Sequence, residues 1–301
     1  NTGYMVTGPS ISPENSFLYQ GNNLCASMMP TCDRVLAYEI FNACIQSAQI
    51  LNIDKEFSDS LQQAIKKFPP IRLRANGGVR EWLEDYDEAH PNHRHTSHLL
   101  ALYPYEQITL DKTPELAAGA RKTIEDRLAA EGWEDTEWSR ANMICFYARL
   151  KDTKQAYQSV LTLESIFTRE NLLSISPAGI AGAPYDIFIL DGNTAGAAGI
   201  AEMLVQGHEG YIEFLPCLPE QWNVGTYKGL CVKGGAEVSA AWNQSLINEA
   251  TLKATADNTF TVKVPQGKNY TITLNNKRIN PVINNGLITV SMKAKDILKF
   301  K

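Results

Sequence analysis

The stretch Thr194-Ala-Gly-Ala-Ala-Gly-Ile-Ala-Glu-Met-Leu-Val-Gln-Gly-His-Glu-Gly-Tyr-Ile-Glu-Phe-Leu215 decides the fold, because two hydrophobic periods meet in it. Up to Gln206, small and apolar residues recur at helical spacing, which predicts a closely packed helix that ends at Gly207. After Gly210, apolar and polar residues alternate, as they do in a half-buried strand. The sequence therefore predicts that helices give way to strands near residue 210.

On the N-terminal side of this boundary the chain has the pattern of a helical protein. Apolar residues recur at helical spacing in further runs at 33–51, 57–68, 97–102, 113–130, 138–150 and 153–167. Thr113 and Pro114 mark the clearest start, as N-cap and first-turn residue, and the Thr96 hydroxyl is expected to cap the short run that follows it. Together with the run that begins at Thr194, this pattern predicts about seven helices.

On the C-terminal side, short alternating segments separated by turn residues predict strands. These segments cover 211–215, 236–242, 248–254, 260–264, 270–274 and 286–292. Strands at this spacing favour an antiparallel β-sandwich. The predicted fold class is therefore α+β with two domains, a helical domain at 1–210 and a β domain at 211–301.

Composition excludes several classes of protein. The 301 residues carry a net charge of −5 and a pI near 5.6, so no nucleic-acid partner is expected. No apolar run reaches the roughly 18 residues of a membrane span. The six cysteines form no C-x-x-C pair, and free buried thiols are favoured over a Cys25–Cys32 disulfide. Because the chain begins with Asn1 rather than Met, we expect a processed protein or a piece of a longer one.

The segment Thr7-Gly-Pro-Ser-Ile-Ser-Pro-Glu-Asn15 offers a carboxylate at a rigid place in the backbone. Ser12 and Pro13 resemble a helix N-cap and the first helical residue, which would place Glu14 in the first turn of a helix. A rigidly held carboxyl suits a general acid, because proton transfer depends on position. The alternative is that Glu14 only complements the helix dipole, and spacing alone favours this alternative.

The segment 81–98 is rich in groups that bind sugars. It holds five carboxylates, four of the chain's five histidines, and the aromatic residues Trp82 and Tyr86. Carboxylates and imidazoles hydrogen-bond hydroxyl groups, while an aromatic face covers the C–H side of a sugar ring. A metal site and a solvated polar loop are the alternatives, but the H-x-x-H-x-H-x-x-H spacing matches no metal motif.

Two later segments each add a candidate residue. In 134–141, Arg140 is expected to pair either with a carboxylate of the site or with a neighbouring glutamate on the surface. In 188–200, Asp191 ends an extended run, and it is either a helix cap or a catalytic base. Asn193 or Thr194 is expected to cap the helix that follows.

In this order the four segments resemble glycoside hydrolase family 95, whose members act on α-L-fucosides and, in some cases, on α-L-galactosides. The resemblance covers about residues 4 to 242, and the order of its motifs makes it more specific than any one of them. It rests on Ser10-Ile-Ser-Pro-Glu-Asn15, Glu81-Trp82, His93-Arg-His-Thr-Ser-His-Leu99, Leu102-Tyr-Pro104, Trp138-Ser-Arg-Ala141, Ala148-Arg-Leu150, Leu190-Asp-Gly-Asn193, Gly199-Ile-Ala-Glu-Met-Leu204, Leu215-Pro-Cys-Leu-Pro219, Lys228-Gly-Leu230 and Gly234-Gly235.

The resemblance implies a fold and a mechanism. The fold is an (α/α)6 barrel with the site in its mouth, followed by a β domain. The mechanism is inverting, with a carboxyl that protonates the leaving oxygen and a polar group on the opposite face that activates water. Matched residue by residue, Glu14 is the acid, Glu81 is the fallback acid, and Asp191 belongs to the water-activating side. The implied substrate contacts are His93, His95, His98, Trp82, Glu81 and Arg140, and neither a cofactor nor a metal is implied.

The sequence also departs from the family. Family members have an asparagine pair and several barrel helices before the S-P-E-N segment, and Thr194 stands where they have an aromatic residue. We therefore expect a partial barrel, open on one side, and a truncated, weakly active enzyme. The alternative is a non-catalytic carbohydrate-binding or scaffold remnant. A glycan substrate, self-association through exposed barrel helices, and a periplasmic or extracellular location complete the expectations.

Overall fold

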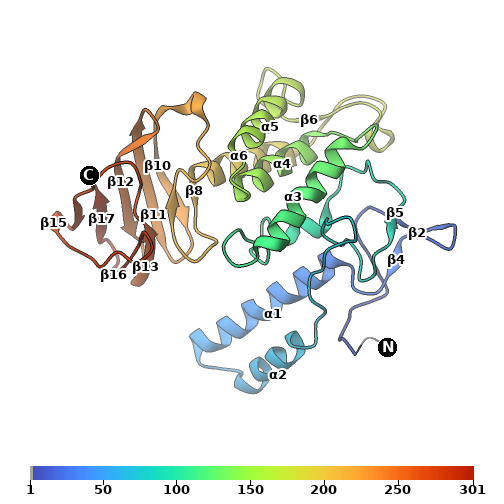
Figure 1. Cartoon of the computed structure of the whole chain (residues 1–301), viewed down its shortest axis with the longest axis horizontal. Coiled ribbons are helices and arrows are strands. Elements are labelled where there is room, and N and C mark those ends of the chain that lie inside the picture. Colours follow the sequence, from blue (N-terminus) through green and yellow to red (C-terminus); the bar gives the residue numbers. More distant parts are fainter. Residues whose placement is uncertain (1–2) are drawn as a thin grey trace. The chain divides into compact units, whose positions relative to one another are not determined.

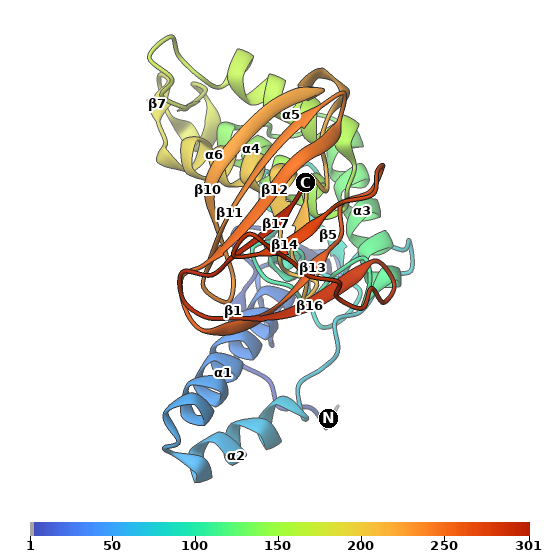
Figure 2. The same ribbon diagram turned by 90° about the vertical axis from the view of Figure 1, so that its left-hand side faces the viewer.

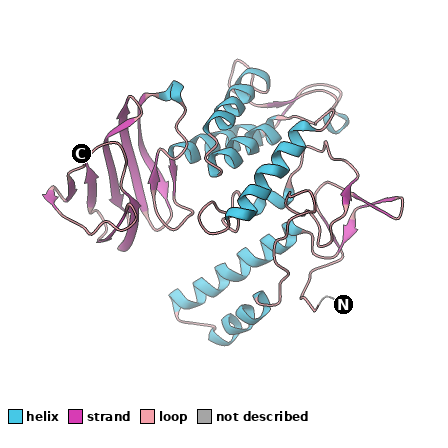
Figure 3. Ribbon diagram, viewed as in Figure 1, coloured by secondary structure: helices cyan, strands magenta, loops and turns pink. Residues whose placement is uncertain are grey.

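The structure, a computed structural model, describes residues 3–301. The chain forms two compact units, Asn1–Ser139 and Arg140–Lys301, which are described separately below. Helices occur in both units, whereas the long strands belong to the second (Figure 3). The mixed α and β class that the sequence predicts is therefore confirmed.

The helices of the first unit are α1 (Thr31–Leu51), α2 (Lys55–Ile65), the 3-10 helix η1 (Ser97–Ala101) and α3 (Pro114–Ala129). α1 and α2 lie side by side as a hairpin (Figure 1). Asn52 ends α1 with a left-handed backbone at φ 54°, which reverses the chain toward α2. Thr113 takes the N-cap position of α3 and Pro114 its first turn, as predicted, but Thr113 makes no side-chain capping bond. Thr96 likewise precedes η1 without capping it through its hydroxyl, so that expectation is wrong.

Short strands surround the segment that carries Glu14. The antiparallel pairs are β1 (Ser10–Ile11) with β4 (Ala26–Ser27), and β2 (Phe17–Tyr19) with both β3 (Asn22–Leu24) and β5 (Asp87–Glu88). The turn at 12–15 therefore connects β1 to β2. The pairing of β5 with β2 places the 81–98 segment beside β2. The sequence predicts none of these strands, because two or three residues are too few to show a hydrophobic period.

The second unit begins within α4 (Glu137–Arg149) and contains α5 (Thr153–Ile166) and α6 (Leu190–Leu204). Small residues let α6 approach its neighbours closely. A Cβ atom at Gly196 would lie 2.6 Å from Leu163 on α5, and a Cβ at Gly199 would lie 2.6 Å from Ile144 on α4. The close packing that the small residues predict for this helix is confirmed.

Gly199→Ala is expected to lower the free energy of unfolding by about 1–3 kcal/mol, because the added methyl group overpacks the contact between α6 and α4. The methyl carbon would overlap Ile144 and lie 3.2 Å from the backbone nitrogen of Cys145. Gly207→Ala is the matched control, since no atom lies within 4 Å of the Cβ that it adds. Denaturant unfolding of the chain measures both variants, and equal stability of the two would contradict the prediction.

A six-stranded antiparallel sheet dominates the second unit (Figure 2). Its order is β10, β11, β12, β17, β14, β15, formed in that order by Val224–Val232, Ala236–Asn243, Leu246–Ala254, Ile297–Phe300, Ile272–Leu274 and Lys277–Arg278. A second pair, β13 (Asn258–Lys263) with β16 (Leu287–Met292), shares with this sheet one hydrophobic core that includes Val238, Leu252 and Phe300. The β-rich C-terminal part is thus confirmed.

The remaining described elements of the second unit are short. They are β6 (Ile175–Ser176), η2 (Ile180–Gly182), β7 (Ile187–Phe188), β8 (Val205–Gln206), β9 (Glu213–Phe214) and the 3-10 helix η3 (Glu220–Trp222). β6 pairs with β7, and β8 pairs with β9. β8 follows α6 directly, so the change from helix to strand falls at Val205, a few residues before the predicted boundary.

Each of the seven predicted helices is present, six of them as α-helices and the run at 97–102 as η1. α6 begins at Leu190 rather than at Thr194, so Asp191 lies within its first turn. The sequence predicts neither β10 nor β17. In β10, a register shift between Tyr227 and Leu230 breaks the alternation of apolar and polar residues that identifies a strand.

No disulfide joins any of the six cysteines in the described part of the chain, so the Cys25–Cys32 alternative is not formed. Cys32, Cys145 and Cys217 are buried, whereas Cys25 and Cys231 are exposed. Among residues 3–301, no helix combines the length and apolar character that crossing a membrane requires.

Candidate functional site

Glu14 lies on a tight turn between β1 and β2, so the expectation that it opens a helix is wrong. The Asn15 N–H donates to the carbonyl oxygen of Ser12 over 2.9 Å, which closes the turn around Pro13 and Glu14. The Ser97 hydroxyl, on η1, donates to the carbonyl oxygen of Pro13. Ser12 and Asn15 are buried while the Glu14 side chain is 57% exposed, so the turn presents this carboxyl to solvent.

An arginine and a histidine face the Glu14 carboxyl. Arg94 Nη2 donates to Glu14 Oε2 over 2.5 Å, and His95 Nε2 lies 3.6 Å from the same oxygen. Arg94 Nη1 also donates to Glu134 Oε2 over 2.9 Å, so two carboxylates share one guanidinium. We call Glu14, Arg94, His95 and Glu134 the Glu14 cluster.

Burial keeps the imidazoles near this cluster uncharged. Desolvation lowers the pKa of His93 to about 4, and it also lowers the pKa of His95. His93 Nδ1 accepts a hydrogen bond from the His95 backbone N–H over 3.0 Å, so the ring proton of neutral His93 belongs on Nε2. A neutral imidazole has one donor and one acceptor nitrogen, which suits recognition of hydroxyl groups.

One tryptophan borders the Glu14 cluster and another lies behind it. The ring of Trp138 packs against His95 with centroids 4.4 Å apart. Trp82 is 1% exposed and packs against Phe17 on β2, with ring centroids 5.2 Å apart. Phe17 in turn stacks on Tyr86 at 4.3 Å. Trp82 thus lies in the interior beside the turn, where it supports β2.

Glu81 and His98 also lie in the interior, beside the same turn. Their side chains are 2% and 1% exposed. Glu81 accepts hydrogen bonds from Ser12 Oγ over 2.7 Å and from Asn15 Nδ2 over 3.2 Å. Burial raises the pKa of Glu81 to about 7. Of the candidate residues in the first unit, the structure therefore places His95 at the exposed Glu14 carboxyl, His93 beside His95, and Glu81, Trp82 and His98 behind the turn.

Asp191 and Arg140 belong to the second unit. Asp191 is exposed in the first turn of α6, where a negative charge complements the helix dipole. Asn193 does not cap α6 as expected, because its Oδ1 atom accepts a hydrogen bond from the backbone N–H of Ser174 over 2.9 Å and ties α6 to the loop after α5. Thr194 lies inside α6, because the helix already begins at Leu190. Arg140 is half-buried in α4.

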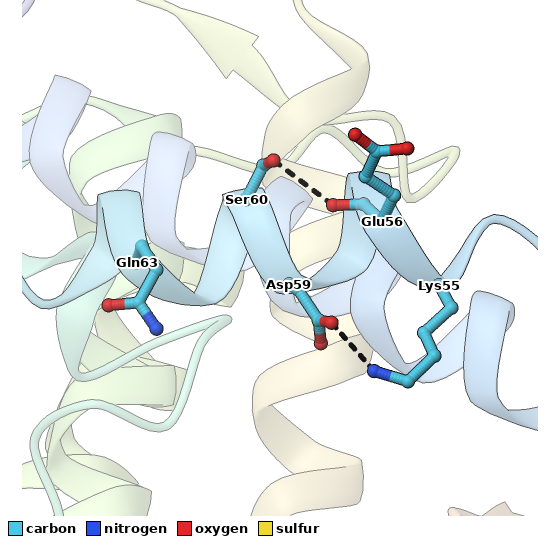
Figure 4. A pocket seen from close by; sticks show the side chains of 5 residues that line it. All are labelled: Lys55, Glu56, Asp59, Ser60 and Gln63. Atoms are coloured by element: carbon cyan, nitrogen blue, oxygen red, sulfur yellow. Dashed lines mark hydrogen bonds and ion pairs between the residues drawn. The ribbon is translucent and has the colours of Figure 1, made fainter.

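A hollow of about 480 Å³ along α2 is a less suitable site (Figure 4). Lys55 pairs with Asp59 over 2.7 Å, and Ser60 donates to the carbonyl oxygen of Glu56 over 3.0 Å, so these polar groups bond within the helix itself. Nor does the described part of the chain, residues 3–301, gather three His, Cys, Asp or Glu side chains in a way that holds a metal ion. The Glu14 cluster is therefore the candidate site of the first unit.

The sequence did not single out several residues that build this site. Arg94 stands between two candidate histidines, and its permanent charge within a sugar-binding motif was the available signal. Glu134 lies in the 134–141 segment, in which the sequence points only to Arg140. Glu88 is one of the five carboxylates of the 81–98 segment, but no local pattern distinguishes it from the others, since it meets Asn15 across 73 residues of sequence. Arg127 lies in none of the four segments.

The chain is similar to curated relatives over most of its own length. It is 32% identical to alpha-L-fucosidase 2 of Arabidopsis thaliana over 252 residues, which are 82% of this chain and 29% of that protein. It is 24% identical to a probable alpha-fucosidase A of Aspergillus oryzae, over 88% of this chain and 38% of that protein. The corresponding protein of Aspergillus niger is 27% identical, over 81% and 31%. The chain thus spans about a third of the length of these relatives.

Among solved structures, a GH127 beta-arabinofuranosidase covers 91% of this chain and 43% of its own, at 11% identity and a TM-score of 0.27, which is too low to establish a common fold. The family comparison is decisive instead. Residues 1–204 match the glycosyl hydrolase family 95 catalytic domain, and residues 206–299 match the glycoside hydrolase family 95 C-terminal domain. Because these two matches account for nearly the whole chain in the expected order, the chain belongs to glycoside hydrolase family 95.

Proposed function

We propose that this chain carries part of an inverting glycosidase that removes terminal α-L-fucosyl, or α-L-galactosyl, residues from glycans. Membership of family 95 supports a glycoside substrate, and the relatives named as α-fucosidases support the sugar. The observation that carries the proposal is the exposed carboxyl of Glu14, fixed on a closed turn and faced by Arg94 and His95.

Glu14 is the proton donor of the proposed reaction. Its side chain reaches solvent while its backbone is fixed, which is the combination that positioned proton transfer requires. Arg94 and His95 offer hydrogen bonds to sugar hydroxyls, and the ring of Trp138 offers a surface for the C–H face of the sugar.

Asp191 belongs to the water-activating side of the proposed reaction. As the C–O bond breaks, the proton of Glu14 passes to the leaving oxygen, and water attacks the anomeric carbon from the opposite face. The proton of that water leaves toward the Asp191 side. Inverting enzymes place their two carboxyl groups roughly 6.5–9.5 Å apart, which leaves room for the water.

The same proposal includes the finer description of the fold. It comprises a partial (α/α)6 barrel at 1–210 and an antiparallel sandwich at 211–301. The change of matched family domain between residues 204 and 206 supports this division. A periplasmic or extracellular location agrees with an enzyme of glycans, and self-association through exposed helix faces stays a prediction.

Hydrolysis of an aryl α-L-fucoside by the chain tests the proposed function. Proton NMR of the first product, recorded before mutarotation, is expected to show β-L-fucose, because a single displacement inverts the anomeric centre. α-L-Fucose as the first product would contradict the inverting mechanism. Saturable binding of fucose without turnover would contradict catalysis by this chain and favour the non-catalytic carbohydrate-binding remnant.

A further inference from the structure

One buried carboxylate is bonded to both ends of the turn that carries Glu14. Ser12 Oγ donates to Glu81 Oε1 over 2.7 Å, and Asn15 Nδ2 donates to Glu81 Oε2 over 3.2 Å. Both donors are almost fully buried, so no solvent bond replaces these contacts if they are lost. The two bonds bracket Pro13 and Glu14, and the Asn15 N–H closes the turn between them.

Further buried groups hold Glu81 in place from the elements packed around it. Arg127 on α3 has Nη2 3.9 Å from Glu81 Oε2 and 2.6 Å from Glu88 Oε2 on β5, and its Nη1 donates to two backbone carbonyls at residues 90 and 91. Glu88 Oε2 also accepts from Asn15 Nδ2 over 3.0 Å. His98 on η1 has Nδ1 3.7 Å from Glu81 Oε2.

These contacts tie the turn to three separate elements. Rotation of the turn therefore requires the loss of several buried hydrogen bonds at once, each of which is costly to leave unmade. The Glu14 side chain itself contributes nothing to this network, because its own contacts are with Arg94 and His95 on the exposed side. The network thus fixes the backbone of Glu14 without occupying its carboxyl.

We propose that Glu81 is the positioning residue of Glu14, a buried clamp that fixes the turn rather than a group that touches the sugar. This role rests on the proposed function only in that Glu14 is the proton donor. It replaces the substrate contact and the fallback acid that the resemblance implied for Glu81, since a side chain 2% exposed behind the turn has no surface to offer a ligand.

The clamp depends on the charge of Glu81. As a carboxylate, Glu81 accepts from both Ser12 and Asn15, and the Arg127 guanidinium and the other donors favour this charged form. Burial and the neighbouring Glu88 carboxylate oppose it and raise the pKa of Glu81 to about 7. Cys32 on α1 and His98 are the remaining titratable neighbours, and burial keeps the thiol protonated and the imidazole neutral near pH 7.

When Glu81 is protonated, a histidine nitrogen without a hydrogen bond lies beside one of its oxygens. His98 Nδ1 lies 3.7 Å from Glu81 Oε2 and is a buried nitrogen for which the described residues provide no hydrogen bond, so we place the proton of protonated Glu81 on Oε2, beside it. That proton occupies the oxygen to which Asn15 donates, so the turn loses one of its two bonds to Glu81.

Glu81→Gln and Glu202→Gln, compared in the whole chain, test the proposal without any need for activity. Glu202 is the matched control, because it is also a carboxylate paired with a buried arginine, Arg149, but belongs to the second unit. Hydrogen exchange of the Asn15 and Ser16 amides is the readout, since these N–H groups bond to Ser12 and to the Asn15 side chain. Glu81→Gln is expected to lower their protection about tenfold or more, and Glu202→Gln to leave it unchanged.

Unchanged protection in a folded Glu81→Gln chain would overturn the proposal. If Glu81→Gln does not fold, Ser12→Ala replaces it, because it removes one donor to Glu81 and leaves the buried carboxylate with Arg127. In that variant a protection equal to that of the wild type would likewise overturn the clamp.

Kinetics then separate positioning from the proposed function itself. In an active chain, Glu81→Gln is expected to lower kcat about 10–100-fold with KM changed less than about twofold, because only the placement of the proton donor is altered. Absence of turnover in the wild-type chain would count against the proposed function, while the exchange result would still decide the role of Glu81.

Discussion

Glu14→Gln is expected to lower kcat for an α-L-fucoside about 10²–10⁴-fold, which is the usual contribution of a positioned general acid. Glutamine keeps the size of the side chain and one carbonyl oxygen but has no proton to donate to a leaving group. Stability is expected to change little, because the Glu14 side chain is 57% exposed and surface ion pairs such as its contact with Arg94 contribute about 0–1 kcal/mol.

The leaving group makes this test specific for acid catalysis. An aryl alcohol of low pKa departs without a proton, so the loss in Glu14→Gln is expected to be much smaller for an activated aryl fucoside than for an alkyl fucoside. Glu115→Gln is the matched control, since Glu115 is an exposed carboxylate in the first turn of α3. An equal loss for both leaving groups would show that Glu14 acts through binding or structure instead of through proton transfer.

Arg127→Met is expected to cause the largest loss of stability, about 3–5 kcal/mol in the free energy of unfolding. The guanidinium is 2% exposed and lies between two buried or half-buried carboxylates, Glu81 and Glu88. Removal of one partner of a buried ion pair leaves an uncompensated charge, which costs more than the pair contributes when intact. The variant also loses two hydrogen bonds to the backbone carbonyls of residues 90 and 91.

This loss is expected to depend on pH in a direction fixed by Glu81. The pKa of Glu81 in the folded chain is about 7, which lies above the ordinary value of 4.5. Between pH 4.5 and pH 7 the folded chain therefore binds more protons at this group than the unfolded chain does, and the ionised carboxylate is the unfavourable form in the fold. This group therefore lowers the stability as pH rises from about 4.5 through 7. Arg127 opposes the effect because it lowers the pKa of Glu81. Without it the pKa rises further, so Arg127→Met is expected to be more destabilising at pH 8.5 than at pH 5.5.

Urea unfolding of Arg127→Met and of the wild-type chain at the two pH values measures this difference, and contributions of other groups largely cancel between the two proteins. Arg127→Lys is the control, because lysine keeps the charge but not the planar fork that reaches both carboxylates and two carbonyls. It is expected to retain the wild-type pH dependence and to lose part of the stability. A loss for Arg127→Met that is the same at both pH values would contradict the assignment of Arg127 as the counter-ion of Glu81.

Local sequence patterns were enough to predict the order of the helices, most of the long strands and the family. Helical and alternating periods predicted the seven helices and most of the long strands, because burial of one face repeats every 3.6 or every two residues within a single segment. The motifs around Glu14, His93, His95 and Asp191 predicted family 95, because each is a local string of residues. The same local view was wrong about Glu14, whose Ser-Pro-Glu context reads as a helix start.

The surroundings of Glu14, and the candidates that reach its carboxyl, follow from contacts between distant parts of the chain. Ser12 and Glu81 are 69 residues apart, Asn15 and Glu88 are 73 apart, and Glu14 and Arg94 are 80 apart, so no period or spacing connects them. Their meeting depends on the pairing of β2 with β5 and on the packing of α1, η1 and α3, which bury one carboxylate and expose another. Burial gives these two carboxylates different roles. The Glu81 carboxylate is removed from water and must be hydrogen-bonded, so it holds the backbone of the turn in place, whereas the exposed Glu14 carboxylate stays accessible to a ligand.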